Sequence, residues 1–279
     1  MYMKMKKVLL FISVLIYCVF PIQAQNIHTK IGKFPIGVMS ADSTYKRGML
    51  SQFINTNINF IHISTAHFTN EQILEICDTS VLKVLIDNNR FEFSQDTFTY
   101  NHNNGINFLD SLGHHSSILG YFYIDEPNIA IFHKMSQYSQ DISDYDSTFA
   151  HTANLLPMYA DKYRIAENIN DSFISADSAS YSAYIDSFVA ICNPTFLMFD
   201  HYPIMGNYKT QNSSLWPRDF FMNLDIISRK SEEYNMPFMY VAAIRGSKII
   251  ASSSGSKRFV DFKYVLNSAL VYGAKGIMY

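Results

Sequence analysis

The sequence ILGYFYIDEP at residues 118–127 decides the fold. Its aromatic and β-branched residues form one short apolar run, which is typical of a buried strand. Because proline cannot join the hydrogen-bond ladder in the middle of a sheet, we expect the strand to stop at the two acids before Pro127. The pair Asp125-Glu126 is therefore predicted at a strand end. There it could take part in chemistry, or it could cap the helix that follows, as acids commonly do before a first turn.

Segments typical of strands and of helices alternate from about residue 34 to the end of the chain. The predicted strands cover residues 35–40, 59–64, 82–87, 118–125, 152–156, 195–199, 238–244 and 276–279. The predicted helices cover residues 44–55, a segment that starts after Thr69, and residues 105–112, 129–142, 180–192, 220–234 and 259–272. Thr69 and Gln72 have the spacing of a capping box at the start of the second helix. This alternation predicts an α/β fold with a parallel sheet, and eight units predict closure as a (β/α)8 TIM barrel. An open doubly wound sheet is the alternative, but the glycine-rich phosphate turn that it usually carries after its first strand is missing.

The two ends of the chain carry separate predictions. Three lysines among residues 1–7 precede an apolar run over residues 8–20, which has the length of a signal-peptide core and is short for a membrane span. Cleavage after Ala24 would give a signal peptide of residues 1–24, a barrel domain of residues 25–279 and a secreted or periplasmic location. An uncleaved membrane anchor is the alternative. The chain stops on the eighth predicted strand, so we expect a fragment that lacks the final helix.

The composition excludes several classes of function. A formal net charge of −2 and the lack of a Lys/Arg run argue against nucleic acid as a partner. Apart from the predicted signal peptide, the only cysteines are Cys77 and Cys192, which lie in predicted helices among apolar neighbours. We expect them to be buried free thiols and not a disulfide framework or a metal set. No cofactor and no stable membrane insertion after cleavage are predicted, and the oligomeric state stays open.

Several predicted strands end in polar side chains, and the carboxyl ends of barrel strands form the site face. Glycoside hydrolysis needs two carboxyl groups, about 5–5.5 Å apart for retention of configuration and about 6.5–9.5 Å apart for inversion. Glu126 is the predicted proton donor, since it has a long side chain and the like charge of Asp125 would help to keep it protonated. Asp200 is the predicted nucleophile or base, with Asp87 in reserve. The predicted substrate-binding residues are Asp125, His62, Asp87, Asn88, Asn154, His201, Tyr202, Arg245 and Tyr279.

Other hydrolase chemistries fit the sequence less well. His62, Asp87, Glu126 and His201 could converge on a metal, but the first strand has no His-x-His and no helix carries His-Glu-x-x-His. A serine nucleophile is weaker still, because the sequence has no Gly-x-Ser-x-Gly turn. No metal site is therefore predicted.

Four short motifs resemble known carbohydrate-active proteins. The sequence GYFYIDEP at 120–127 resembles the strand-four signature of clan A glycoside hydrolases, an Asn-Glu-Pro whose Glu is the acid/base. The sequences NLLP at 154–157, FDHYP at 199–203 and LVYGAKGIMY at 270–279 are similar to those of secreted bacterial barrel proteins described as glycoside hydrolase-like or family 42 β-galactosidase-like. The resemblance implies a TIM barrel and a carbohydrate substrate.

Carried over to this chain, the resemblance implies that Glu126 is the acid/base. It also implies that Asp125 replaces the Asn that binds the sugar 2-hydroxyl in clan A enzymes, although an ionised Asp can only accept such a bond. Clan A enzymes carry the nucleophilic Glu on strand seven, where residues 238–244, FMYVAAI, offer no carboxyl group. Two hypotheses remain. The chain is either a secreted glycosidase that cleaves O-glycosidic bonds, with its second carboxyl at Asp200 or beyond Tyr279, or a degenerate carbohydrate-binding barrel.

Overall fold

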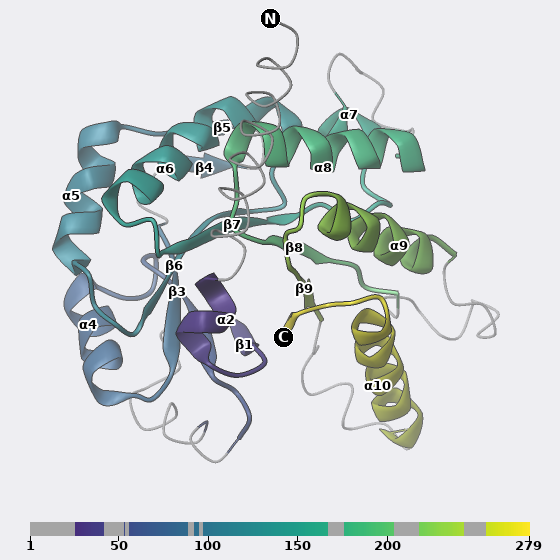
Figure 1. The fold of residues 1–279 in the computed structure, drawn as a ribbon, viewed down its shortest axis with the longest axis horizontal. Helices are drawn as coiled ribbons and strands as arrows, with labels where there is room; N and C mark the ends of the chain where they lie inside the picture. The colour runs from purple at the N-terminus through teal and green to yellow at the C-terminus, as the bar shows by residue number, and fades with distance from the viewer. Residues whose placement is uncertain are drawn as a thin grey trace, which may run out of the picture.

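The computed structural model describes residues 26–41, 53, 56–88, 92–94, 97–166, 176–203, 218–242 and 255–279. Eight parallel strands form a closed barrel in chain order, with the last strand paired to the first (Figure 1). They are β1 (Ile36–Ala41), β2 (Phe60–Ser64), β3 (Lys83–Asp87), β6 (Ile118–Asp125), β7 (Ala150–Leu155), β8 (Leu197–Asp200), β9 (Phe238–Val241) and β10 (Gly276–Met278). Helices lie between the strands and surround the barrel. The predicted (β/α)8 fold is confirmed.

Most of the described helices form an outer layer around the barrel, whereas α2 (Asn26–Ile31) lies within this ring, over one end of the barrel (Figure 1). The others are α4 (Asn70–Thr79), α5 (His102–Leu112), the 3-10 turn η2 (Ile129–Ile131), α6 (Phe132–Tyr145), α7 (Lys162–Ile165), α8 (Ser178–Cys192), α9 (Arg218–Glu233) and α10 (Gly255–Val271). The capping box predicted at Thr69 and Gln72 is confirmed, and Cys77 and Cys192 are buried free thiols as expected. Within the described ranges, no helix is both long and apolar enough to cross a bilayer.

Some predicted boundaries are corrected. The side chain of Asn101 accepts a hydrogen bond from Asn104 N at 3.1 Å, so α5 begins at His102 and not at residue 105. The preceding loop contains a two-stranded hairpin, β4 (Glu92–Ser94) and β5 (Thr97–Thr99).

Two later elements also differ from their predicted bounds. The helix predicted from Ile129 begins as a 3-10 turn, with Asn128 as its cap, and continues to Tyr145. Strand β9 ends at Val241, before the predicted end at residue 244. The helix predicted over residues 44–55 falls outside the described residues except for Phe53.

Two apolar cores follow from the alternation of side chains along each strand. Residues such as Phe60, Leu85 and Met198 fill the barrel interior, whereas their strand neighbours pack against the helices. Ile27 of α2 belongs to the interior core, so this short helix covers the barrel at the pole where the strands begin (Figure 1). The other pole, where the strands end, is the one at which a barrel places its chemistry.

The middle of β6 depends on one glycine. Gly120 pairs with Ala150 of β7, and a Cβ at Gly120 would lie 1.7 Å from the carbonyl oxygen of Ala150. Only glycine therefore allows the two strands to approach this closely. The register shifts between Phe122 and Asp125, and Asp125 lies beside Asn154 at the end of the strands.

Candidate active site

Strand β6 ends in an unusual backbone conformation. Glu126 has a φ of 48°, in the left-handed region, and is followed by Pro127. A non-glycine residue in this region carries strain on the order of 1 kcal/mol, which persists only when the surroundings hold it. The Glu126 N–H donates to the carbonyl of Asn154 at 2.8 Å, which extends the pairing with β7 by one residue. The strained turn lifts the Glu126 side chain out of the strand direction.

Two side chains from neighbouring elements hold this turn. Arg164 of α7 donates from Nη2 to the carbonyl oxygen of Glu126 at 2.8 Å. Its Nη1 lies 3.7 Å from Glu126 Oε2, and the Arg164 side chain is only 14% exposed. The Tyr184 hydroxyl of α8 donates to the carbonyl of Pro127 at 2.7 Å. The two backbone carbonyls that the sheet cannot satisfy therefore have partners.

Asn154 connects β6 to β8. Its Nδ2 donates to Asp125 Oδ1 at 2.8 Å, and its amide also interacts with the Asp200 carboxyl. Asn154 is fully buried, and its Oδ1 has no hydrogen-bond partner among the described residues. The Asn154 amide thus lies between the carboxyl groups of Asp125 and Asp200, and its Oδ1 accepts no hydrogen bond from the described residues.

Asp200 ends β8 and points into the barrel mouth. Along β8, Leu197 and Phe199 pack against the helices and Met198 lies in the interior, so alternation directs Asp200 inward. Asp200 is only 4% exposed, and its Oδ1 has no hydrogen-bond partner in the described part of the chain. The Tyr202 hydroxyl interacts with the same carboxyl group.

The carboxyl groups at this pole influence one another. Burial raises the pKa of Asp200 to about 7, and the charges of Glu126 and Asp125 add to the rise. Burial also raises the pKa of Glu126, where the charge of Asp125 adds to the rise and Arg164 opposes it. Asp87 has a pKa raised to about 7 by burial, with a hydrogen bond from Ser64 opposing the rise and Asp125 adding to it.

Asp125 differs from its neighbours in exposure. The residue is open to solvent at the barrel mouth, yet the protein around its carboxyl limits hydration and raises its pKa. The hydrogen bond from Asn154 and the charge of Arg164 oppose this rise. Four acids therefore share one electrostatic environment, and at neutral pH at least one of them can carry a proton.

The structure does not bring every predicted site residue to this group. His62 faces the barrel interior two residues before the end of β2, where its ring lies 4.8 Å from that of Phe122 and burial lowers its pKa to about 4. Asn88 is buried, and its Oδ1 lies 3.5 Å from the Thr65 hydroxyl. Arg245 lies outside the described residues.

Two further predicted residues point away from the barrel mouth. His201 follows the inward-facing Asp200 and lies behind β8, where its Nδ1 is 3.0 Å from Asn223 Oδ1 of α9. Tyr279 packs toward α10, with its ring 6.1 Å from that of Phe262. The His201 ring also packs edge to face against that of Tyr159, with 4.8 Å between the ring centroids.

Three residues of the site were missed or not assigned from the sequence. Arg164 and Tyr184 act through tertiary contacts, which no local sequence pattern predicts. The one available signal was an arginine in a long loop at the carboxyl end of a strand. Tyr159 lies in the same loop and is 44% exposed; partial burial raises its pKa to about 12, and the charges of Asp200 and Glu126 add to the rise.

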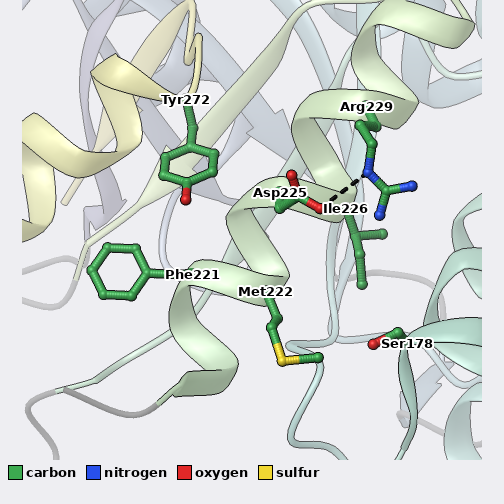
Figure 2. A pocket seen from close by; sticks show the side chains of 7 residues that line it. All are labelled: Ser178, Phe221, Met222, Asp225, Ile226, Arg229 and Tyr272. Carbon is green, nitrogen blue, oxygen red and sulfur yellow. Dashed lines mark hydrogen bonds and ion pairs between the residues drawn. The ribbon is translucent and has the colours of Figure 1, made fainter. Parts of the chain in front are cut away.

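Two other features of the described residues bear on the site. No group of three or more His, Cys, Asp or Glu residues within them is arranged to hold a metal ion. A pocket of about 310 Å³ lies among α8, α9 and the end of α10, and it is lined by Ser178, Phe221, Met222, Asp225, Ile226, Arg229 and Tyr272 (Figure 2). It contains none of the predicted site residues, so it is separate from the carboxyl group at the barrel mouth.

Comparisons with known proteins extend only to the fold. No family model and no curated protein matches the chain in sequence. Among solved structures, a candidate α-L-fucosidase from Bacteroides thetaiotaomicron is similar, with a TM-score of 0.58, 8% identity, and coverage of 87% of this chain and 83% of the other. The GH99 endo-α-mannosidase from Bacteroides thetaiotaomicron has a TM-score of 0.50 and 13% identity, with 85% of this chain and 65% of the other covered. These similarities establish a shared barrel fold, and membership of family 42 stays a prediction.

Proposed function

We propose that this chain is a secreted glycoside hydrolase that cleaves O-glycosidic bonds of an oligo- or polysaccharide, with Glu126 and Asp200 as its two catalytic carboxyl groups. The observation that carries the proposal is their common position. They lie at the ends of two strands of one closed barrel, at the pole where barrel enzymes place their chemistry, and the charge of Glu126 adds to the raised pKa of Asp200.

The unmatched acceptors support a ligand rich in hydroxyl groups. Asp200 Oδ1 and Asn154 Oδ1 are buried at the barrel mouth without donors among the described residues. Buried acceptors are normally satisfied, so a ligand that brings O–H donors would complete them. Tyr159 offers an exposed ring beside them, and aromatic rings pack well against the apolar faces of sugars. We assign Asp125, Asn154, Tyr202 and Asp87 to substrate binding.

Similar barrels include proteins described as an α-L-fucosidase and an endo-α-mannosidase, which agrees with this substrate class. The export signal predicted over residues 1–24 agrees with an extracellular or periplasmic glycan. Hydrolysis would add one water across the glycosidic bond, with one carboxyl group giving a proton to the leaving oxygen and the other supplying an electron pair.

A carbohydrate-binding barrel without catalytic activity is the second candidate. Strand β9 and Ala242 after it provide no carboxyl group at the position where clan A enzymes carry their nucleophile. In this case the same acceptors and Tyr159 would bind a glycan without cleaving it.

A hydrolysis and binding screen separates the two candidates. The purified protein and its Glu126→Gln and Asp200→Asn variants are incubated with a panel of oligosaccharides and polysaccharides, and released reducing ends are measured. We expect release by the wild type and a loss of at least about 100-fold in each variant, with glycan binding retained. The exposed changes Glu232→Gln and Asp225→Asn on α9 serve as controls that should keep full activity. Binding without release by the wild type would favour the second candidate.

A further inference from the structure

We propose that Arg164 is a positioning residue that keeps Glu126 in its charged form, and that the exchangeable proton of the site resides on Asp200. This inference rests on the proposed function and assigns roles within it. It reverses the roles that the sequence favours, in which Glu126 donates the proton.

The first support is the placement of Arg164. The guanidinium group contacts the backbone carbonyl and approaches the carboxyl group of one residue, at 2.8 Å and 3.7 Å. Arginine stays charged at any relevant pH, and a positive charge next to a carboxyl group favours its ionised form. Since the Arg164 side chain is 14% exposed and that of Glu126 is 23% exposed, solvent weakens this interaction less than it would on an open surface.

The second support is the strained turn. Glu126 keeps its left-handed conformation while its N–H and C=O are both bonded, to Asn154 and to Arg164. The same arginine therefore holds the backbone of residue 126 and lies beside its carboxyl group. A group that must change its protonation in each turnover would gain little from such a fixed cation.

The third support is the contrast at Asp200. No cation pairs with its carboxyl group among the described residues, and the group is almost completely buried, with one oxygen lacking a donor. A buried carboxyl group without a counter-ion is more stable with a proton bound. Its pKa of about 7 agrees with this geometry.

Other titratable groups of the described chain also face the pair, and burial raises the pKa of Glu126 as well, with Arg164 opposing that rise. Asp125 of β6 lies beside both and disfavours ionisation of each. Among the described residues, the phenols that interact electrostatically with Glu126 or Asp200 include Tyr159, Tyr181, Tyr184, Tyr202 and Tyr240. All of these phenols have raised pKa values, so they stay neutral across the working range.

The chemical step follows from this assignment. The proton of Asp200 passes to the glycosidic oxygen as the bond between that oxygen and the anomeric carbon breaks. Glu126 supplies the electron pair, either directly to the anomeric carbon or by taking a proton from the water that attacks it. The leaving sugar receives one hydrogen and the anomeric carbon receives one hydroxyl group, so one water is consumed. When Glu126 attacks directly, Asp200 then removes the proton from the water that releases the sugar.

The decisive test is a titration that needs no substrate. The protein is labelled with 13C at its Asp and Glu carboxyl carbons, and the signals of residues 126 and 200 are assigned with Glu126→Gln and Asp200→Asn. We expect Glu126 to titrate at least about one pH unit below Asp200. Arg164→Met should raise the Glu126 midpoint by about one unit or more, as expected when an opposite charge is removed. Arg164→Lys, which keeps the charge, should restore most of the difference.

The controls and contrary outcomes are defined by the same spectra. Arg229→Met removes an exposed arginine of α9 and should leave both midpoints in place. A wild-type Glu126 that titrates at or above Asp200 would overturn the assignment, and so would an Arg164→Met variant with an unchanged Glu126 midpoint. If Arg164→Met does not fold, the order of the Glu126 and Asp200 midpoints in the wild type and the spectrum of Arg164→Lys still test the assignment.

Activity separates this inference from the proposed function. If the wild type hydrolyses glycans, the basic limb of kcat/KM should follow the Asp200 midpoint, and Arg164→Met should move the acid limb upward and reduce kcat/KM by about 10-fold or more. If no glycan is hydrolysed, the titration still shows where the proton lies. The failure of one proposal is therefore distinguishable from the failure of the other.

Discussion

The two ends of strand β6 face opposite poles of the barrel and differ in how their polar groups are satisfied. At the first end, Lys30 of α2 places its Nζ 3.5 Å from the Ile118 carbonyl and 4.3 Å from the centre of the Phe149 ring. Ile27 of the same helix packs into the barrel interior. At the second end, the strand stops in the strained Glu126, close to buried acceptors that have no donors in the described chain.

The comparison separates groups that stabilise the barrel from groups that are available to a ligand. A folded chain normally pairs its buried polar atoms, because leaving them unpaired costs roughly 1–3 kcal/mol each. In the described part of the chain, the Lys30 ammonium and the Ile118 carbonyl at the pole covered by α2 are paired, whereas Asp200 Oδ1 and Asn154 Oδ1 at the pole with the acids have no partner. Departures of this kind are expected where a protein keeps groups for binding or chemistry.

The largest effect on stability is expected from a substitution in the middle of β6, between the two poles. Gly120→Ala would place a Cβ 1.7 Å from the Ala150 carbonyl oxygen, so β6 and β7 would have to separate. We expect a loss of about 4 kcal/mol or more in the free energy of unfolding, measured by urea denaturation. Gly113→Ala is the control, since a Cβ there meets nothing within 4 Å and only its φ of 62° is unfavourable. It should cost about 1 kcal/mol, and an equal cost for both variants would contradict the close approach.

The next largest effect is a dependence of stability on pH that arises from Asp200, at the pole where the strands end. The pKa of Asp200 is about 7 in the folded chain, against an ordinary value of 3.8 for Asp, so the folded state binds more protons between these values. Stability should therefore fall as pH rises from about 4 to about 7, with a share of about 3 kcal/mol from Asp200. Asp200→Asn should remove this part of the pH dependence of stability. Asp87, whose pKa is also raised to about 7, should still contribute its part in the variant. Parallel pH curves of stability for the wild type and the variant would refute the buried, protonated Asp200.

A smaller effect is expected at the turn after Glu126. Tyr184→Phe removes the hydroxyl that donates to the Pro127 carbonyl at 2.7 Å and leaves a buried acceptor unpaired. We expect a loss of about 1–2 kcal/mol in stability, measured by thermal and urea unfolding. Tyr264→Phe on α10, where the residue is 47% exposed, is the matched control and should change stability by less than about 0.5 kcal/mol. Equal changes in both variants would mean that the turn does not depend on Tyr184.

The amino pole should show the smallest effect, with the opposite response to pH. Burial lowers the pKa of Lys30 to about 8, so the unfolded chain binds more protons between that value and 10.5. Stability should therefore rise as pH increases through this range, by less than about 1 kcal/mol because the side chain is partly solvated. Lys30→Met should flatten this rise in pH-dependent unfolding curves. A slope that survives the substitution would show that another group is responsible.

The fold followed from the sequence because its signals are local. Alternating periods, the capping box at Thr69 and the apolar surroundings of Cys77 depend on neighbours within a few residues. Arg164 could not be placed in this way, since its contact with Glu126 joins two segments of the chain that are brought together only by the closed barrel. The direction of His201 was predictable in principle, because the period of two in β8 turns it to the opposite face from Asp200.

The central claim is that a glycosidic bond is held between Glu126 and Asp200, and a crystal structure tests it most directly. The Asp200→Asn variant is crystallised with an oligosaccharide that the wild type binds or cleaves. We expect a glycosidic oxygen within about 3.2 Å of the residue 200 side chain, with the anomeric carbon facing Glu126. A sugar bound only elsewhere, for example in the pocket among α8, α9 and α10, would contradict the claim.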